Sequence, residues 1–387
     1  MIFSKDLIDK FAPEADCIPA MKIWKIPENK ENKFSEICNS GEYFAELKKD
    51  GYWYQYEKTT NYQYLFSRNI STTTGILTEK IANVPHIQKA LSCLPSGTIL
   101  IGEIYYPGKT SKDVTKIMGC LPEEAIKRQN NQGLIHYYLH DVIKYNNIDI
   151  QSEGAWNRYQ VLKAIWDKFN LKQYDFLELA EVITDNIQEA TAEALQNGEE
   201  GMVLKKKTYP YAPDKRPAWS TIKIKKMDYI DAICIGFCDA TKEYTGKEPN
   251  TWEYWEDFGG KLYHWRYLDD NGCATIKTPM FPVTKGYYYG WKTAIRIGAL
   301  DKNGKIVEIG TVASGLTDEL RADFAKNPET YLNKIVSLQC MEKDSKEHTL
   351  RHGFFKGFRD DKNFKDCTLD TIFWQKKKFL IKYTCKD

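Results

Sequence analysis

The sequence lacks the features of secreted, zinc-binding and membrane proteins. Its ten cysteines form no Cys-x-x-Cys pair, and the two nearest each other, Cys234 and Cys238, lie in an apolar run without a nearby histidine. Zinc is therefore not expected, and reduced cysteines are the simpler interpretation. The N-terminus carries no apolar signal region, and no stretch approaches the length of a membrane span. We therefore expect a cytoplasmic protein with no membrane partner.

The sequence also lacks an excess of charge of either sign. Its 55 lysines and arginines nearly balance 53 aspartates and glutamates, which leaves a formal net charge of +2. A nucleic-acid partner would therefore have to be held by a local basic face. Two basic runs, at 205–226 and 376–378, are candidates for that face. A lysine run is more often a solvated surface, but the first run alternates with apolar residues, which predicts that some of its lysines point inward.

The length and the pattern of the chain predict an α+β protein with two main domains. A chain of 387 residues can bury two or three cores. Residues 1–40 are expected to form a short segment packed on the first domain, and residues 41–228 mix strand-like with helical runs. The predicted strands are 42–48, 52–58 and 62–68, read as one β-meander, then 98–106 and 134–143. The predicted helices are 82–94, 111–129 with an interruption at Pro122, 154–170 and 186–197.

Residues 229–387 show mainly strands and turns, which predicts a small β-barrel. Hairpin-turn signals occur at 269–272 and 301–304, and one helix is predicted at 317–326. An aromatic-rich insertion at about 251–291 is either a hairpin that touches nucleic acid or a set of extra barrel strands.

Several familiar catalytic signatures are missing, and a lysine motif stands in their place. There is no Gly-x-x-x-x-Gly-Lys-Ser/Thr phosphate loop and no convincing Ser-His-Asp set. Residues 46–51 read Glu-Leu-Lys-Lys-Asp-Gly, so Lys48 follows an apolar strand and precedes a turn. A lysine amine attacks phosphorus only when it is uncharged, and desolvation and nearby cations favour that form. Taken alone, Lys48 would more often be an ordinary surface lysine.

Other charged residues at strand ends could complete a pocket around Lys48. Glu103 ends one apolar strand, and Glu200 and Lys205 bracket another. Lys223 and Lys225 are two residues apart and so share one face of a strand. Carboxylates can hold Mg²⁺ and ribose hydroxyls, and lysines can hold phosphates.

In this order, the motifs resemble the covalent nucleotidyltransferases, and the ATP-dependent DNA ligases best, over residues 41–370. In that family the motif lysine attacks the α-phosphate of ATP, AMP passes to the 5′-phosphate at a nick, and the 3′-hydroxyl then displaces AMP. The resemblance implies that Lys48 is the nucleophile and that Glu46 binds the adenine amino group. It implies further roles for phosphate contact (Arg68, Lys205, Lys223, Lys225), for ribose or metal binding (Glu103) and for metal binding (Glu200).

Two positions depart from the family pattern. The segment 137–141 resembles the family strand whose aromatic residue stacks on adenine, but it has His140 where Phe or Trp is more usual. Tyr138 lies on the same face and could take that place. Trp53 stands where many ligases have an arginine. Which group of this chain makes that arginine's contact with the nucleotide or the nick is open.

The C-terminal region strengthens the resemblance. Residues 359–362 read Arg-Asp-Asp-Lys and are similar to the end motif on the family's OB domain, and 310–317 is also ligase-like. The resemblance implies that Arg359 and Lys362 orient the pyrophosphate leaving group, with Asp361 nearby.

The resemblance implies a nucleotidyltransferase domain of antiparallel sheets with flanking helices, followed by an OB-fold barrel. It also implies a monomeric, compact ligase of phage or virus type that seals nicked duplex DNA. ATP is the expected donor because the zinc cysteines of NAD-dependent ligases are missing; Mg²⁺ is the expected metal, with Mn²⁺ as a substitute. Three alternatives stay open: an RNA ligase, a GTP-using mRNA capping guanylyltransferase, and a non-catalytic OB-type nucleic-acid-binding protein.

Overall fold

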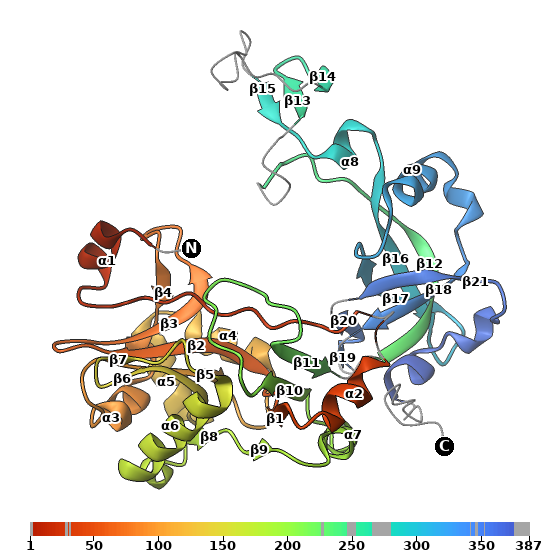
Figure 1. Ribbon diagram of the computed structural model, residues 1–387. Helices are drawn as coiled ribbons and strands as arrows, with labels where there is room; N and C mark the ends of the chain where they lie inside the picture. The colour runs from red at the N-terminus through yellow and green to blue at the C-terminus, as the bar shows by residue number, and fades with distance from the viewer. Residues whose placement is uncertain are drawn as a thin grey trace. The chain divides into compact units, whose positions relative to one another are not determined.

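The computed structural model describes residues 3–27, 30, 32–225, 228–245, 253–264, 280–340, 342–344, 347–351 and 353–374. The chain forms two compact units that divide between Lys226 and Met227 (Figure 1). We call them the first and the second unit. No helix in the described ranges has both the length and the apolar composition needed to cross a membrane.

The first unit contains two antiparallel-rich sheets. The larger has the order β4 (Leu77–Glu79), β3 (Gln63–Ile70), β2 (Gly51–Lys58), β5 (Thr98–Tyr105), β6 (His136–Tyr145) and β7 (Ile148–Asp149), and β8 (Leu177–Leu179) pairs with β6. The smaller has the order β11 (Thr221–Lys225), β10 (Gly201–Lys206), β1 (Tyr43–Leu47) and β9 (Val182–Ile183).

The predicted meander of the first three strands is wrong, because β1 belongs to the smaller sheet. It pairs with β10 and β9, while β2 pairs with β3 and β5. Phe44 and Ala45 are fully buried, which suits a central strand with partners on both edges. The Asp50-Gly51 turn separates the sheets, and Gly51 packs so tightly on β5 that an added Cβ would lie 2.2 Å from the Ile104 carbonyl oxygen.

Helices pack on both sheets of the first unit. They are α1 (Lys5–Phe11), α2 (Lys33–Asn39), α3 (Pro85–Leu91), α4 (Ser111–Met118), α5 (Pro122–Gln132), α6 (Ala155–Lys168) and α7 (Ile187–Gln196), with 3-10 turns at Ile81–Asn83 and Leu171–Gln173. Pro122 begins α5 at a position where a missing N–H costs nothing, so the predicted interruption at this proline is confirmed.

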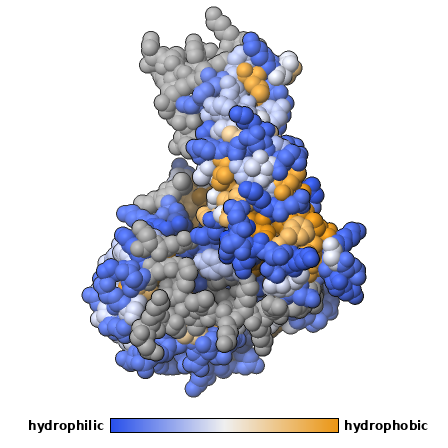
Figure 2. All heavy atoms as spheres, turned by 90° about the vertical axis from the view of Figure 1, so that its right-hand side faces the viewer, coloured by the Kyte–Doolittle hydropathy of each residue, from blue (hydrophilic) through white to orange (hydrophobic). Residues whose placement is uncertain are grey.

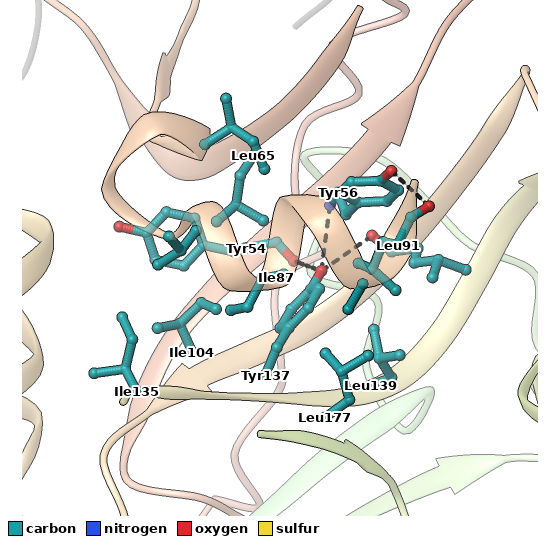
Figure 3. Packing of buried hydrophobic residues seen from close by; sticks show 14 of the residues in the cluster. Tyr54, Tyr56, Leu65, Ile87, Leu91, Ile104, Ile135, Tyr137, Leu139 and Leu177 are labelled. Atoms are coloured by element: carbon teal, nitrogen blue, oxygen red, sulfur yellow. Dashed lines mark hydrogen bonds between the residues drawn. The ribbon is translucent and has the colours of Figure 1, made fainter. Parts of the chain in front are cut away.

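Tyrosines tie the core of the larger sheet together (Figure 3). The Tyr137 hydroxyl accepts from the Tyr56 amide at 3.2 Å and donates to the Tyr54 carbonyl at 2.9 Å. The Tyr56 hydroxyl donates to the Leu91 carbonyl at 3.0 Å. Because each buried hydroxyl has a partner, these rings join β2, β6 and α3 without an unsatisfied polar group.

The second unit is a five-stranded barrel of OB-fold order. The strands β17 (Ile306–Val312), β16 (Lys292–Leu300), β12 (Asp228–Asp239), β18 (Ile335–Cys340) and β21 (Phe354–Arg359) pair in that sequence. A parallel bridge between Ser314 and Phe354, with the Phe355 amide 2.9 Å from the Ser314 carbonyl oxygen, joins the two edges. Helix α9 (Asp318–Lys326) follows β17 in the chain, as in a Greek-key OB barrel.

The insertion between β12 and β16 forms a sheet of its own. It contains β13 (Tyr254–Asp257), β14 (Leu262–His264), β15 (Met280–Pro282) and the short helix α8 (Lys285–Tyr288). The alternative of extra barrel strands is therefore wrong, and the prediction of a single helix in this region missed α8. The predicted turn at 269–272 and the basic run at 376–378 lie outside the described residues.

Smaller elements complete the second unit. They are β19 (Glu342–Asp344) paired with β20 (Thr349–Arg351), 3-10 turns at Pro328–Thr330 and Phe364–Asp366, and a π-helical turn at Asp370–Trp374. The turn at 301–304 joins β16 to β17 with the Gly304 amide 3.0 Å from the Asp301 carbonyl oxygen, which confirms that hairpin signal. Among the residues coloured by hydropathy in Figure 2, hydrophilic ones predominate, and hydrophobic ones gather in one patch of that face.

Candidate active site

A cavity of about 540 Å³ lies in the first unit and is lined from both sheets. Alternate residues of the smaller sheet face it. These are Glu46 and Lys48 at the end of β1, Val203 and Lys205 on β10, and Lys223 and Lys225 on β11. The intervening Ile222 and Ile224 are buried on the opposite face, so the prediction that Lys223 and Lys225 share a face is confirmed.

The larger sheet contributes a row of side chains to the same cavity. Trp53 lies opposite Glu103, Glu103 lies opposite Tyr138, and all three line the cavity. His140, two residues beyond Tyr138, lines it as well. The register of β2, β5 and β6 therefore brings together residues that are far apart in the chain, from Trp53 to His140.

Lys48 and Lys225 share one carboxylate. The Lys48 Nζ lies 2.7 Å from Glu200 Oε2, and Lys225 pairs with Glu200 Oε1. The Lys48 side chain is 16% exposed and that of Glu200 15%, so the pair is shielded but reachable. The Lys48 amide donates to the Gly201 carbonyl at 2.9 Å, which fixes the start of the motif turn against β10.

A second buried pair lies deeper in the cavity. The Lys205 Nζ is 2.8 Å from Glu46 Oε1 and donates to the His140 carbonyl at 2.8 Å. The other carboxylate oxygen, Glu46 Oε2, is buried and has no hydrogen-bond partner in the described part of the chain. Burial raises the pKa of Glu46 to about 7, and Lys205 opposes that rise. An unsatisfied buried acceptor is costly, so this atom is suited to a ligand N–H.

His140 is neutral near pH 7. Burial, and after it the charge of Lys205, lowers the pKa of His140 to about 3. A neutral imidazole can stack on a base as an aromatic ring, so the histidine is compatible with the stacking position.

Glu103 and Arg68 supply unpaired charges to the cavity. Neither forms a hydrogen bond or an ion pair with another described residue, and both line the cavity. Burial raises the pKa of the Glu103 carboxyl to about 7, with Lys48 opposing the rise. Burial also lowers the pKa of Lys223 and of Lys225, and neighbouring lysines add to that effect. This set is suited to binding hydroxyls, cations and phosphates.

The remaining predicted residues form a cluster in the second unit. The Arg359 guanidinium contacts both carboxylate oxygens of Asp361 at 2.7 and 2.6 Å. Arg359 and Lys362 also flank Asp231 on β12, at 3.7 and 3.6 Å. The Arg359 contact lowers the pKa of Asp361 to about 2.

The sequence of the first unit matches an established family model. Residues 28–225 match the model of the ATP dependent DNA ligase domain, which is half of the chain. The chain belongs to this ligase family. The match spans Glu46, Lys48, Glu103, Glu200 and Lys225, which all line or adjoin the cavity.

Curated relatives are DNA ligases of greater length. Human DNA ligase 4 is 27% identical over 352 residues, covering 84% of this chain and 35% of the human protein. A DNA ligase of Methanothermobacter thermautotrophicus is 23% identical over 206 residues, covering 52% of this chain and 36% of its own length. The chain thus spans about a third of the length of the curated relatives that it matches.

Solved ligase structures share the fold. Pmar-Lig_Pre has a TM-score of 0.59 and 17% identity, covering 92% of this chain and 71% of its own. A structure from a structure–function analysis of Lig E DNA ligases has a TM-score of 0.53 and 13% identity, covering 88% of this chain and 99% of its own. These likenesses support a ligase fold of a nucleotidyltransferase unit followed by an OB barrel.

The ligase motifs did not reveal every residue of the site. The segment Ala20–Ile23 lines the cavity, held by the Lys22 amide on the Lys215 carbonyl (2.8 Å) and the Trp24 amide on the Thr221 carbonyl (2.8 Å). The hydrophobic cluster of Trp53 includes Met21 from this segment. The only sequence signal for the segment was a short apolar run between prolines.

Arg158 is a second missed residue. It contacts both oxygens of Asp141 at 2.9 Å and joins α6 to the strand of His140. A third is Glu178, which accepts from Tyr105, lies 2.9 Å from His136 Nδ1 and lies 3.5 Å from the Lys49 Nζ. Nothing in the sequence marked either residue, because each acts through partners on distant strands.

The ligase family uses ATP and a divalent metal ion, and the cavity has carboxylates that fit a metal. Glu103 is unpaired, and Glu200 has both oxygens directed at lysines of the cavity. Within the described ranges, no cluster of three or more His, Cys, Asp or Glu side chains forms a ready cage. Mg²⁺ commonly takes one or two protein carboxylates and completes its shell with phosphate oxygens and water. The ion would supply charge neutralisation at the phosphates.

Proposed function

We propose that the chain is an ATP-dependent DNA ligase that seals 5′-phosphate/3′-hydroxyl nicks in duplex DNA. The observation that carries the proposal is the position of Lys48 in a cavity that is also lined by two carboxylates and two strand lysines, Glu46, Glu103, Lys223 and Lys225. One end of the cavity is suited to a purine amino group and the other to phosphates.

In the first step, Lys48 Nζ gives up a proton to solvent, and the uncharged amine attacks the α-phosphate of ATP with release of a second proton to solvent. A P–N bond forms, the bond to the β-phosphate oxygen breaks, and pyrophosphate leaves. The ion pair with Glu200 must be broken first, since it occupies Nζ. Lys223 and Lys225 then stabilise the charge that develops on the α-phosphate. Lys205 anchors Glu46 and so positions the base indirectly.

The later steps transfer AMP to the nick and seal it. The 5′-phosphate oxygen attacks the lysyl-AMP phosphorus and frees Lys48. The 3′-hydroxyl then attacks the 5′-phosphate. The P–O bond between that phosphate and AMP breaks, and AMP leaves. Arg68 and Glu103 are proposed to contact phosphate and ribose, and His140 to stack on adenine. Arg359 and Lys362, with Asp361, are proposed to orient pyrophosphate in the first step.

Glu46 favours ATP over GTP as the donor. Adenine presents an N6 amino donor where guanine presents the O6 acceptor. The unpartnered Glu46 Oε2 accepts the first and repels the second. This is the observation against a capping guanylyltransferase. We further infer Mg²⁺ as the metal, with Mn²⁺ as a substitute, and a monomer acting inside a cell.

Labelling with nucleotide tests the proposal. Purified protein incubated with Mg²⁺ and α-labelled ATP is expected to form an acid-labile, base-stable AMP adduct. Lys48→Ala should abolish the adduct, and Lys127→Ala, at an exposed lysine of α5, should not. Labelling from GTP alone would contradict the ligase proposal, and the absence of any adduct would favour a non-catalytic binding protein.

Sealing assays separate the DNA ligase from the RNA ligase. Nicked duplexes with DNA or RNA on each side of the nick should be compared under the same conditions. We expect joining of the all-DNA nick. Joining that requires ribonucleotides at the nick would support the RNA ligase alternative instead.

A further inference from the structure

Tyr138 lines the cavity and carries a buried hydroxyl that is unused. Its side chain is 5% exposed and lines the cavity, but the hydroxyl has no hydrogen-bond partner in the described ranges. Buried tyrosine hydroxyls are normally bonded, as the neighbouring Tyr137 hydroxyl is. The unsatisfied state therefore points to a partner that arrives from outside the protein.

A charged network contacts the face of the Tyr138 ring. The Lys49 Nζ lies 5.2 Å from the Tyr138 ring centroid and 4.8 Å from that of Tyr105. The same ammonium lies 3.5 Å from Glu178 Oε2. Cation–π contact of this kind orients a ring without using its hydroxyl. Since Glu178 also pairs with Tyr105 and His136, the network is anchored at several points.

The orphan hydroxyl and the orphan oxygen of Glu46 are complementary but not bonded to each other. Both atoms are buried, both side chains line the same cavity, and one is a donor while the other is an acceptor. Burial, and after it the carboxylate of Glu46, raises the pKa of Tyr138, so the hydroxyl keeps its proton. A ligand that carries both an N–H donor and an acceptor can satisfy the two groups at once.

We propose that Tyr138 is a specificity-determining residue whose hydroxyl donates to a ring nitrogen of adenine adjacent to the amino group that Glu46 accepts. Adenine carries such acceptors at N1 and N7, on either side of N6. Tyr138 thus serves as a hydrogen-bond donor to the base and not as the stacking ring, a position left to His140. This inference rests on the proposed use of ATP.

Binding of deaza nucleotides tests the contact without catalysis. Protein discharged with pyrophosphate is titrated calorimetrically, without divalent metal, with ATP, 1-deaza-ATP and 7-deaza-ATP. Wild type is expected to bind one deaza analogue about tenfold more weakly than ATP, because one hydrogen bond of average strength is lost. Tyr138→Phe should bind ATP and that analogue with dissociation constants within about twofold of each other. The variant and the analogue would then each lack the same hydrogen bond. The analogue that wild type discriminates identifies N1 or N7.

A matched variant and a stability measurement exclude a structural role. Tyr106→Phe makes the same change at a buried tyrosine whose hydroxyl bonds the Gln132 carbonyl at 2.6 Å, and it should keep the wild-type discrimination. Tyr138→Phe should unfold at the wild-type temperature or above, because it removes an unpaired polar atom.

The outcomes distinguish this inference from the proposed function. If Tyr138→Phe keeps the wild-type ratio between ATP and the analogues, or if wild type does not discriminate, the contact is refuted while ligation stands. If wild-type protein neither binds ATP nor forms an adduct with it, the proposed function fails and the inference fails with it.

Discussion

At the scale of single residues, the site depends on buried groups that have lost water but not yet gained a ligand. Glu46 Oε2 and the Tyr138 hydroxyl are in this condition, and both side chains line the cavity. Burial of such groups costs free energy in the empty protein, and a matching ligand recovers it. The groups proposed to recognise the base are therefore the same groups whose burial is unfavourable in the empty protein.

The pH dependence of ATP binding should report Glu46. Burial raises its pKa to about 7, so below that pH the carboxyl becomes protonated and loses the charge that strengthens its bond to the adenine amino group. We expect the dissociation constant of ATP to rise by up to about tenfold per pH unit as pH falls below 7.

Glu46→Gln removes the titrating carboxyl and, with it, the ion pair with Lys205. Glu103 and the phosphates of ATP titrate in both proteins, so the difference between the two pH profiles isolates Glu46 from the nearby Lys205, Asp141 and His140. Calorimetric titrations from pH 5.5 to 8.5 would measure it. Parallel profiles for wild type and the variant would show that Glu46 does not accept from the base.

At the scale of elements, the site is rigid because the strands that carry it are tied to helices through buried polar pairs. Arg158 on α6 and Asp141 on β6 form such a pair, with side chains 3% and 9% exposed. Asp141 follows His140 directly, so α6 positions the strand on which the proposed stacking residue lies.

Arg158→Met should destabilise the protein by about 3–5 kcal/mol, because it leaves the buried Asp141 without its ion-pair partner. Burial alone would raise the pKa of Asp141, but Arg158 lowers it below the ordinary value of 3.8. A lowered carboxyl pKa stabilises the fold at pH values above the unfolded pKa, and this contribution is lost as pH falls through the folded value.

Urea unfolding at pH 7 and at pH 3 would check this prediction. The difference between wild type and Arg158→Met should be large at pH 7 and smaller at the acidic end. Arg128→Met is the control, because its pair with Glu124 on α5 is largely exposed and should contribute under about 1 kcal/mol. Equal losses for the two variants would contradict the importance of burial.

At the scale of the whole molecule, the proposed chemistry is divided between two units with separate cores. The nucleotide cavity belongs to the first unit, and the Arg359, Asp361 and Lys362 cluster belongs to the barrel. If this cluster acts only on pyrophosphate, its side chains are needed for the adenylylation of Lys48. They are then less important for sealing of the nick.

Arg359→Ala should therefore impair adenylylation by ATP more than sealing of a pre-adenylylated nick. Single-turnover rates of the two reactions would measure the difference. Arg296→Ala provides the control, since Arg296 makes the same kind of two-point contact with Glu308 on the barrel (3.2 and 2.6 Å). Equal losses in both reactions for Arg359→Ala would refute the pyrophosphate role.

The sequence indicated much of the candidate site because its signals are local. Period-two alternation around Ile222 and Ile224 identified Lys223 and Lys225 as neighbours on one face, and the turn after Lys48 marked the end of a strand. The barrel could likewise be inferred from short strands and the turn at 301–304. No local sequence pattern specifies which distant strands pair with each other. The sequence therefore predicted β1 in the wrong sheet.

The order of motifs, the family and the choice of Lys48 as the proposed nucleophile came from the sequence alone, because side-chain chemistry and spacing along the chain are local properties. The tertiary structure decided which charges meet: Glu200 between Lys48 and Lys225, Lys205 between Glu46 and His140, and Tyr138 opposite Glu103. Strand alternation fixes the face on which a side chain lies, but only the packing of one sheet against another fixes what it faces. For that reason the unused hydroxyl of Tyr138 became visible only in the folded protein.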